Sequence, residues 1–427
     1  MRILKKLILP MLLVSVSIFT YLLCKHGHVL MFLWNFPQPT EMRAEIPIYD
    51  PVEFGREIES GYSKKDITPG RFSWVAGFMP PHPGLAIKDR LWVKSLALRD
   101  KNGEIVVFVS CDLIGLLPDE SEKIFSLVRN VQRERISITA THTHSGPDTM
   151  GLWGGKNHKY MEKLRRSIAE AIDESVASLE KSSVRFGRGN FDGHAHGRDE
   201  NPADPSVNVI QVLRKGQIVT LVNFACHPDV VQGLQISADF PYFLSERIRM
   251  RLGSETIFVP GAIGGVQPSG DRVSGHYFVR TLGENLADAV VSIMKNPDVP
   301  DSSGIWIRKG MVVAPFENRS DLKKAVDFRL VTNLRDSQGN VSAEVSRIDI
   351  GGLKILTVPG ELFPKIWWNV KKDDKKTVIF GLTGGEFGYI LLPEDHGSGK
   401  HRYHSRISVG PTFGLKIQKA LRELMKN

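Results

Sequence analysis

Hydrophobic and polar positions follow two different periods along most of the chain. Continuous apolar runs of strand length, such as EIVVFVSCDLIG (104–115), predict buried strands. Segments with apolar residues three and four positions apart, such as 159–182, predict amphipathic helices. The expected strands are 104–115, 135–144, 183–189, 207–214, 218–229, 256–265 and 376–385, with a hairpin over 345–360, and the expected helices are 119–132, 159–182, 241–253, 277–295, 361–372 and 412–426. Because strands and helices alternate without an internal repeat, the pattern predicts a single α/β domain.

The first 35 residues have a different pattern. Arg2, Lys5 and Lys6 precede about eighteen apolar or weakly polar residues, which predicts a marginal membrane span with a cytoplasmic start. A cleavable signal peptide is the alternative interpretation. Both place the rest of the chain outside the cytoplasm, in a periplasm or an extracellular space. We therefore expect an anchor or signal segment over 1–35, a proline-rich linker over 36–60 and the main domain over 61–427.

Composition narrows the classes of protein that fit. Of the 427 residues, 41% are hydrophobic and 24% are charged, as in ordinary globular proteins, which excludes a disordered or fibrous chain. The net charge of +9 is spread over short runs, so no nucleic-acid partner is expected. Cys111 and Cys226 each lie in an apolar run and are expected to be buried, and the sequence leaves open whether they pair.

Several expected strands end in polar side chains that can bind metal. One strand ends in His142 and His144, another ends in His227, and Glu361 and Tyr389 each follow a further apolar run. Functional groups of α/β proteins gather where strands give way to loops. Imidazoles, a carboxylate and a phenol oxygen are donors that suit Zn²⁺, so the pattern indicates a zinc site. The alternative is that the His-x-His pair lines a pocket without a metal.

The segment ISITATHTHSGP resembles the Thr-His-Thr-His-Ser-Gly-Pro signature of the neutral/alkaline, non-lysosomal ceramidase family. Further matching segments follow in the family's order over 60–415, namely KKDITP, AGF, RLWVKSLALRDKNGEIVVFVSCDLIGL, DPSVNVIQV, NFACHP, FVPGAIGGVQP, VPGELF and GYILLPED. The resemblance implies a ceramidase-like catalytic domain of packed mixed β-sheets flanked by helices, without the C-terminal immunoglobulin-like domain of full-length ceramidases. It also implies hydrolysis of a linear amide bond in an N-acyl lipid such as ceramide.

Carried over residue by residue, the resemblance implies one zinc ion per chain. Its ligands would be His142, His227, Glu361 and Tyr389. His144 and Arg198 would sit over the substrate carbonyl, where both can stabilise an oxyanion and His144 can protonate the leaving nitrogen. The implied reaction is attack by zinc-bound hydroxide, because zinc lowers the pKa of a bound water towards about 7.

The glycine loop of this chain departs from the family. Ceramidases carry Gly-Asp-x-Ser-Pro there, whereas this chain has Gly264-Gly265-Val266-Gln267-Pro268. Gln267 therefore takes the place of the serine that contacts the scissile amide, and we include it among the catalytic residues. A glutamine forms hydrogen bonds but is not a nucleophile. A serine-acyl route is thus not expected unless Ser269 occupies that place, and direct hydrolysis is favoured.

Three other interpretations stay open beside a ceramidase-like hydrolase. The same fold would also suit a different amide or ester of the cell envelope. Loss of the loop serine would suit a non-catalytic surface binding protein. An amidohydrolase barrel also begins with His-x-His at a strand end, but the pattern does not supply its eight regular βα units. The expected partners are a lipid or small amide substrate and, through the N-terminal segment, the membrane.

Overall fold

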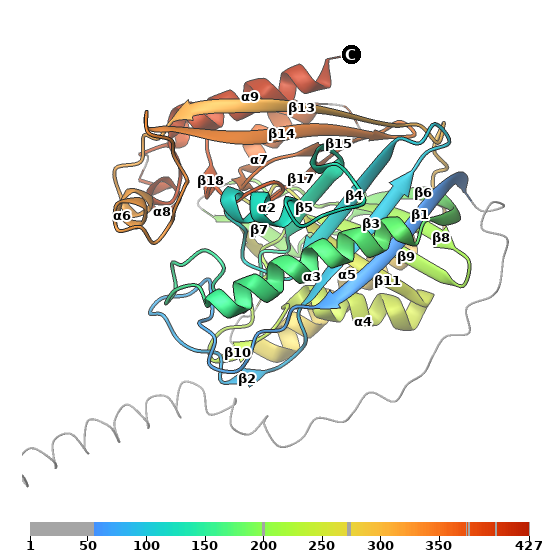
Figure 1. Cartoon of the computed structure of the whole chain (residues 1–427), viewed down its shortest axis with the longest axis horizontal. Helices are drawn as coiled ribbons and strands as arrows, with labels where there is room; N and C mark the ends of the chain where they lie inside the picture. Colours follow the sequence, from blue (N-terminus) through green and yellow to red (C-terminus); the bar gives the residue numbers. More distant parts are fainter. Residues whose placement is uncertain are drawn as a thin grey trace, which may run out of the picture. The chain divides into compact units, whose positions relative to one another are not determined.

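The protein is described by a computed structural model over residues 55–198, 201–270, 275–372, 374, 376–397 and 399–426. Its largest element is a mixed eight-stranded sheet (Figure 1). In spatial order its strands are β11 (Ser254–Pro260), β9 (Gln217–Phe224), β8 (Ser206–Arg214), β6 (Glu180–Asn190), β1 (Arg56–Asp66), β3 (Trp92–Arg99), β4 (Ile105–Cys111) and β5 (Ile136–Ala140). The outer pairs β11–β9 and β4–β5 are parallel, and the pairs between them are antiparallel.

A second sheet packs on one face of the first. Its strands are, in order, β13 (Ile305–Pro315), β14 (Asn340–Ile350), β15 (Leu353–Thr357) and β17 (Thr377–Phe380). Leu96 and Val212 of the large sheet share one apolar core with Ile348 and Phe380 of the second. Three short pairs complete the strands described, namely β2 (Ala86–Ile87) with β10 (Gln235–Ile236), β7 (Ala195–Gly197) with β12 (Val266–Pro268), and β16 (Glu361–Leu362) with β18 (Tyr389–Ile390).

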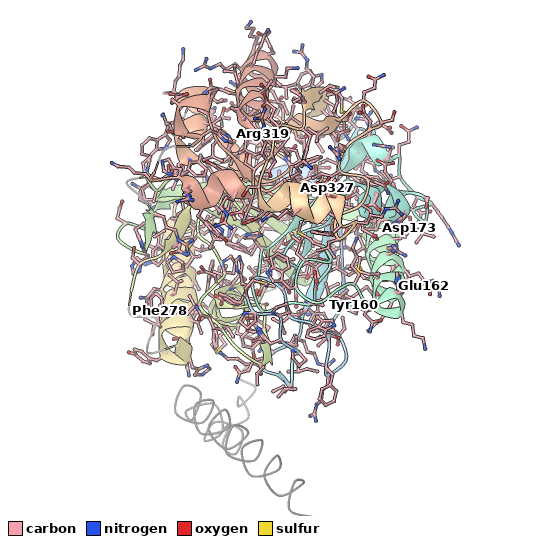
Figure 2. All side chains as sticks on the ribbon, turned by 90° about the vertical axis from the view of Figure 1, so that its left-hand side faces the viewer. Tyr160, Glu162, Asp173, Phe278, Arg319 and Asp327 are labelled. Atoms are coloured by element: carbon pink, nitrogen blue, oxygen red, sulfur yellow. The ribbon has the colours of Figure 1, made fainter. Side chains whose placement is uncertain are left out.

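The described helices lie on the outer faces of both sheets and in the connections between strands (Figure 1). They are α2 (Pro118–Phe125), α3 (His158–Ala177), α4 (Phe240–Leu252), α5 (Gly275–Ile293), α6 (Asp321–Asp327), α7 (Pro364–Lys371), α8 (Arg402–Arg406) and α9 (Pro411–Met425). Helix α3 packs along β1 and β3, α4 packs on α5 and β11, and α9 packs on β13 and β14 (Figure 1). On α3, Tyr160 is buried and donates to the carbonyl of Ile67, whereas Glu162 lies on the surface (Figure 2). This amphipathic spacing is the one that the sequence predicted.

The two ends of the large sheet approach each other. Ser110 Oγ of β4 donates to the carbonyl of Phe258 in β11 at 2.6 Å. Lys94 Nζ of β3 donates to the carbonyl of Thr256 in β11 at 2.7 Å. Since β11 is the first strand in this order and β3 and β4 are the sixth and seventh, the sheet must curl for these bonds to form. The curl brings the exits of β5, β9 and β11 into one region.

The predicted fold class, packed mixed sheets flanked by helices, is confirmed. The 345–360 hairpin is β14–β15, paired antiparallel. Helix α2 stops at Phe125, earlier than the expected 132, because the amides of Arg129 and Asn130 donate to Asp173 of α3 and turn the chain along that helix. Strand β1 begins at Arg56, inside the stretch 36–60 expected to be a linker.

The expected membrane anchor over 1–35 lies outside the described residues. Within the part of the chain that the structure describes, no helix combines the length and apolarity needed to cross a bilayer. Cys111 and Cys226 are buried, as expected from their apolar runs, and they do not form a disulfide.

Candidate metal centre

His142 is placed by a break in the backbone after β5. The amide of Thr141 donates to the carbonyl of Cys111 at 2.8 Å, and the amide of His142 donates to that of Leu113 at 2.9 Å. The φ of His142 is 70°, a left-handed conformation that costs a non-glycine residue about 1–2 kcal/mol. The strand therefore ends in a strained residue whose imidazole is buried, 4% exposed.

His142 and His227 present the same ring nitrogen to Glu361. Nδ1 of His142 lies 2.6 Å from the carbonyl oxygen of Ile114, and Nδ1 of His227 lies 2.6 Å from that of Val266. A carbonyl oxygen only accepts, so each Nδ1 carries a proton. Nε2 of His142 lies 3.5 Å from Oε1 of Glu361, and Nε2 of His227 lies 2.8 Å from Oε2. The two imidazoles and the carboxylate thus converge.

The charges of this group depend on one another. Burial on its own raises the pKa of Glu361, but His142 and His227 outweigh it and lower that pKa to about 2. Burial lowers the pKa of His227, and the hydrogen bond and charge of Glu361 outweigh that effect and raise it. Burial lowers the pKa of His142. Without a metal, a shared proton between His227 and Glu361 compensates the buried carboxylate.

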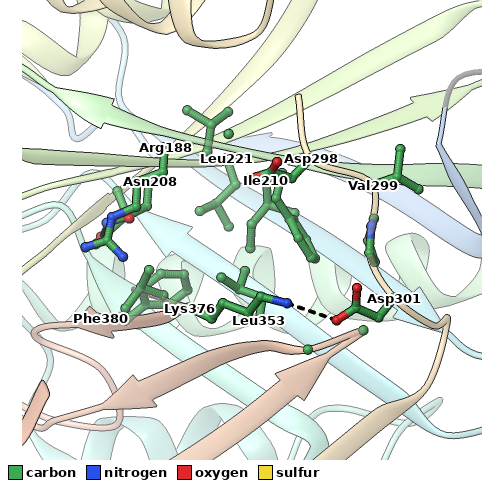
Figure 3. Close-up of a pocket in the computed structure, with 18 residues that line it drawn as sticks. Arg188, Asn208, Ile210, Leu221, Asp298, Val299, Asp301, Leu353, Lys376 and Phe380 are labelled. Carbon is green, nitrogen blue, oxygen red and sulfur yellow. Dashed lines mark hydrogen bonds and ion pairs between the residues drawn. The ribbon is translucent and has the colours of Figure 1, made fainter. Parts of the chain in front are cut away.

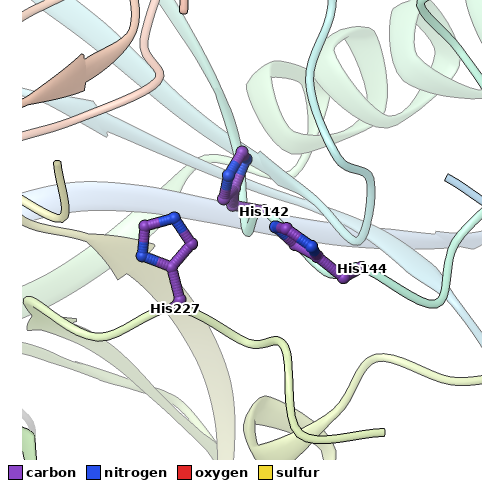
Figure 4. A group of neighbouring side chains, drawn as sticks. All are labelled: His142, His144 and His227. Atoms are coloured by element: carbon purple, nitrogen blue, oxygen red, sulfur yellow. The ribbon is translucent and has the colours of Figure 1, made fainter. Parts of the chain in front are cut away.

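His144 lies beside His142 and His227, and its two ring nitrogens form no hydrogen bond. Its ring centroid lies 5.0 Å from that of His142 and 5.8 Å from that of His227 (Figure 4). Both ring nitrogens are buried without a hydrogen-bond partner, although the residue is partly exposed through its carbon atoms. Burial, reinforced by His142, lowers the pKa of His144 to about 3. The ring is therefore neutral near pH 7.

Gly77, in the segment Ala76-Gly77-Phe78, makes room for His144. A Cβ atom at Gly77 would lie 2.6 Å from three atoms of the His144 side chain. The φ of Gly77 is +100°, in the region that favours glycine. The Phe78 ring meets the imidazole edge-on at a centroid distance of 5.4 Å. The segment Ala76-Gly77-Phe78 therefore packs against the His144 ring and helps to fix its position.

Tyr389 joins the group through strand pairing. It lies opposite Glu361 in the parallel pair β16–β18, which puts the two side chains next to each other. Burial raises the pKa of Tyr389, and the charge and hydrogen bond of Glu361 raise it further. The positive charge of Arg198 acts on both Tyr389 and Tyr403, so the guanidinium lies on the tyrosine side of the site. The backbone amide of Arg198 donates to the carbonyl of Gly265 at 2.7 Å.

Gln267 and Ser269 are not among the residues that line the cavity beside His142 and His144. Gln267 Nε2 donates to Oδ2 of Asp229, a buried carboxylate, at 2.9 Å. The negative charge of Asp229 in turn acts on His142, His144 and His227. Ser269 Oγ lies 3.1 Å from Nδ1 of His196 and does not line the cavity. Gln267 thus contacts a carboxylate whose charge acts on the three histidines, and its catalytic role stays a prediction.

A cavity of about 320 Å³, here called the histidine pocket, opens onto these groups. His142, His144, Glu361 and Tyr389 form one part of its wall. Apolar side chains form most of the rest, including Ile114, Leu117, Met150, Leu152, Leu322 and Val331. Such a cavity, with a few convergent polar groups in apolar walls, is typical of small-molecule sites.

The donor set fits a divalent metal ion. The ligating atoms of His142, His144 and His227 lie within 4.8 Å of one another (Figure 4). Metal-binding histidines usually donate their second ring N–H to a carbonyl or carboxylate, as Nδ1 of His142 and His227 do here. The Nε2 atoms of the two histidines and the anionic Glu361 are the donor types that zinc prefers. His142, His227 and Glu361 would therefore hold the ion, with Tyr389 beside Glu361.

Two acidic residues of the site were not predicted from the sequence. Asp229 follows His227 in the segment Cys226-His227-Pro228-Asp229, where it resembled an ordinary turn residue. Glu386 lies in the wall of the histidine pocket, 4% exposed. The only signal for Glu386 was a charged residue in the apolar stretch three positions before Tyr389.

Of the comparisons with known proteins, the one with solved structures supports the fold. No family model matches the chain, and no curated protein matches its sequence. Among solved structures, the neutral ceramidase from Pseudomonas aeruginosa matches with a TM-score of 0.71 at 16% identity, covering 86% of this chain and 74% of that one. A structure described as ceramidase complexed with C2 matches with a TM-score of 0.69 at 16% identity, covering 86% of this chain and 75% of that one. The resemblance seen in the sequence is confirmed, and the chain has a neutral ceramidase-like fold.

Proposed function

We propose that this chain is a zinc-dependent hydrolase of linear amides whose acyl part is apolar, with ceramide or another N-acyl lipid as the leading substrate class. The observation that carries the proposal is that His142 and Glu361 of the metal-type donor set, together with His144, line an apolar pocket. An acyl chain would fill the apolar part while its amide carbonyl meets the polar part. The neutral ceramidases that share the fold support this substrate class.

The chain's own residues have separable roles in this proposal. A bound zinc ion would polarise the carbonyl and lower the pKa of a water molecule. His142, His227 and Glu361 hold the ion. His144, neutral because of its low pKa, would accept a proton or hydrogen-bond the developing oxyanion. Arg198 would contribute positive charge on the Tyr389 side of the carbonyl.

Gln267 acts through Asp229 in this proposal. Its amide holds one oxygen of Asp229, whose charge faces all three histidines. The side chain is not a nucleophile, so a direct hydrolytic route without an acyl-enzyme is favoured. This places Gln267 among the positioning residues of the site.

We further propose that the catalytic domain works outside the cytoplasm, tethered by segment 1–35. A tether would keep the pocket near a membrane that contains its substrate. The competing functions are hydrolysis of another envelope amide or ester on the same fold, and ligand binding without catalysis.

The decisive experiment combines metal analysis with a substrate screen on the full chain. We expect about one zinc ion per chain and turnover of labelled ceramide or N-dodecanoyl amides. Chelation should abolish the turnover, and added zinc should restore it. A zinc-loaded chain that hydrolyses esters but no amide would favour the second candidate. A chain that binds no metal and turns over nothing would contradict the hydrolase proposal.

A further inference from the structure

Glu386 carries a hydrogen-bonding atom that no protein group uses. Its Oε1 accepts the backbone amide of Gly388 at 2.7 Å. Its Oε2 is buried and has no hydrogen-bond partner. A buried polar atom left without a partner costs about 1–3 kcal/mol. Such a cost in a side chain that lines a cavity points to a partner supplied by the occupant of the cavity.

The surroundings of Glu386 narrow the chemistry of that partner. No lysine or arginine is among the described residues that line the histidine pocket. Burial raises the pKa of Glu386, and the like charge of Glu361 raises it further. A second anion is therefore disfavoured there. An ammonium group would lose its hydration in a mostly apolar cavity.

A hydroxyl group meets these conditions. It both donates and accepts hydrogen bonds, so it can pair with Oε2 whether or not the carboxyl carries a proton. Gly115 makes room for the Glu386 side chain itself, because a Cβ atom at Gly115 would lie 2.9 Å from Cγ of Glu386. Met150 is the other close neighbour there, since its sulfur lies 3.3 Å from the same position.

We propose that Glu386 is a specificity-determining residue that binds a hydroxyl group of the substrate inside the histidine pocket. The inference rests on the proposed function, because it assigns a substrate feature to the same site. The hydroxyl can belong to the acyl half or to the amine half of the amide. Both sources offer the same chemistry to Oε2.

Three amides of similar size distinguish a hydroxyl on the acyl half from one on the amine half. N-Dodecanoyl propylamine has no hydroxyl, N-dodecanoyl ethanolamine has one on the amine half, and N-(3-hydroxydodecanoyl) propylamine has one on the acyl half. With the zinc-loaded full chain, we expect kcat/KM for one hydroxylated amide to exceed that for the parent amide by about tenfold or more, since a site built to bind a hydroxyl rejects its deoxy analogue. Which amide is preferred identifies the source.

Two variants test whether Glu386 produces the preference. Glu386→Met should reduce the ratio to below about threefold, and Glu386→Gln should keep part of it because the amide still forms hydrogen bonds. Glu162→Met, on the surface of α3, is the control and should keep the full ratio (Figure 2). Without ligand, Glu386→Met should unfold at the same or a higher temperature than the wild type, because an unpartnered buried carboxyl is removed. A purely structural residue would instead lower that temperature.

The outcomes also separate this inference from the proposed function. If the parent amide is hydrolysed but hydroxylation has no effect, or if Glu386→Met keeps the preference, the role of Glu386 is wrong and the hydrolase proposal stands. If no amide is hydrolysed, the same three probes are compared by their dissociation constants. A hydroxyl preference in binding that disappears in Glu386→Met would then support the role of Glu386, and its absence would overturn it.

Discussion

Two cavities of this protein differ in the residues that line them, and the larger one is not the one beside the candidate metal centre. The larger, here called the sheet cavity, measures about 430 Å³ and lies between the large sheet and the second sheet (Figure 3). Strand residues such as Phe186, Leu221 and Phe380 form its walls, and the ion pair Lys376–Asp301, 2.9 Å long, lies exposed at its edge. No histidine is among the described residues that line it. The histidine pocket is smaller and holds the candidate metal centre.

The difference follows from where along the strands each cavity lies. In the middle of a strand, the ladder satisfies the backbone and fixes each side chain to one of two faces. At a strand end the backbone is free to break, as it does at His142 with its positive φ. A break can aim several polar side chains at one point. Strand ends, rather than the larger of the two cavities, therefore determine where chemistry is expected in this protein.

The largest expected effect comes from removing a metal ligand. His142→Ala should abolish zinc binding and lower kcat/KM by more than about 100-fold. Removing a group that only hydrogen-bonds to a metal ligand already costs up to about 100-fold, and removing the ligand itself should cost more. The control is His158→Ala, an exposed histidine at the start of α3. Zinc content by elemental analysis and amide turnover are the measurements. Full zinc occupancy in His142→Ala would contradict the metal centre.

A smaller loss is expected from moving His144 without touching the metal ligands. Gly77→Ala places a Cβ 2.6 Å from the His144 side chain, so the imidazole must shift. A shift of about 1 Å costs of order 100-fold in rate. We expect kcat to fall by about 10- to 100-fold while zinc content stays unchanged.

Gly103→Ala is the matched control for Gly77→Ala. Its φ of +87° imposes similar backbone strain, but a Cβ there meets no atom within 4 Å. It should lose some stability and keep its kcat. Equal losses of kcat in the two variants would show that backbone strain, and not the position of His144, matters.

The pH dependence of the metal-free protein should follow the Glu361–His227 pair. The pKa of Glu361 is lowered to about 2, so its stabilisation is present above the ordinary pKa of 4.5 and is lost as the pH falls towards 2. The pKa of His227 is raised, so its stabilisation is present below 6.5 and is lost as the pH rises through the folded-state value. With chelator present, the difference in Tm between the wild type and Glu361→Gln should therefore peak between pH 4.5 and 6.5. A flat difference from pH 3 to 9 would contradict the pairing.

The smallest effect is expected from filling the sheet cavity. Leu221→Phe adds volume where space exists, so the free energy of unfolding should change by less than the roughly 1–3 kcal/mol typical of overpacking. We expect kcat/KM within twofold of the wild type, on the order of experimental scatter. Calorimetry and the amide assay measure the two quantities. A large loss of activity would mean that the sheet cavity takes part in substrate binding.

The sequence predicted most of the elements because burial leaves a local period. Helix α3 and the hairpin β14–β15 have clear periods and are predicted, although α3 ends at Ala177 rather than 182 because β6 begins at Glu180. Strand β13 was not predicted, because charged and small residues such as Arg308, Lys309 and Gly310 interrupt its apolar positions. Its pairing with β14 and its cover by α9 stabilise it instead.

For the site, the sequence predicted residue types better than contacts. His142, His144, His227, Glu361 and Tyr389 were selected as polar groups at strand ends, and the structure brings them together. Their roles as zinc ligands and catalytic groups stay predictions. The place of Gln267 at the scissile bond also stays a prediction, and the structure shows its amide donating to Asp229.

The sequence by itself determined which faces are buried, which strands end in histidine or carboxylate, and which family the segments resemble. These features are local, because each depends on neighbours a few positions away in the chain. The tertiary structure alone decided that the sheet curls until β11 meets β3 and β4, and that His142 meets Glu361, more than 200 positions away in the chain. It alone left the second oxygen of Glu386 without a partner in the pocket. Such contacts depend on packing between distant elements, and no local period records them.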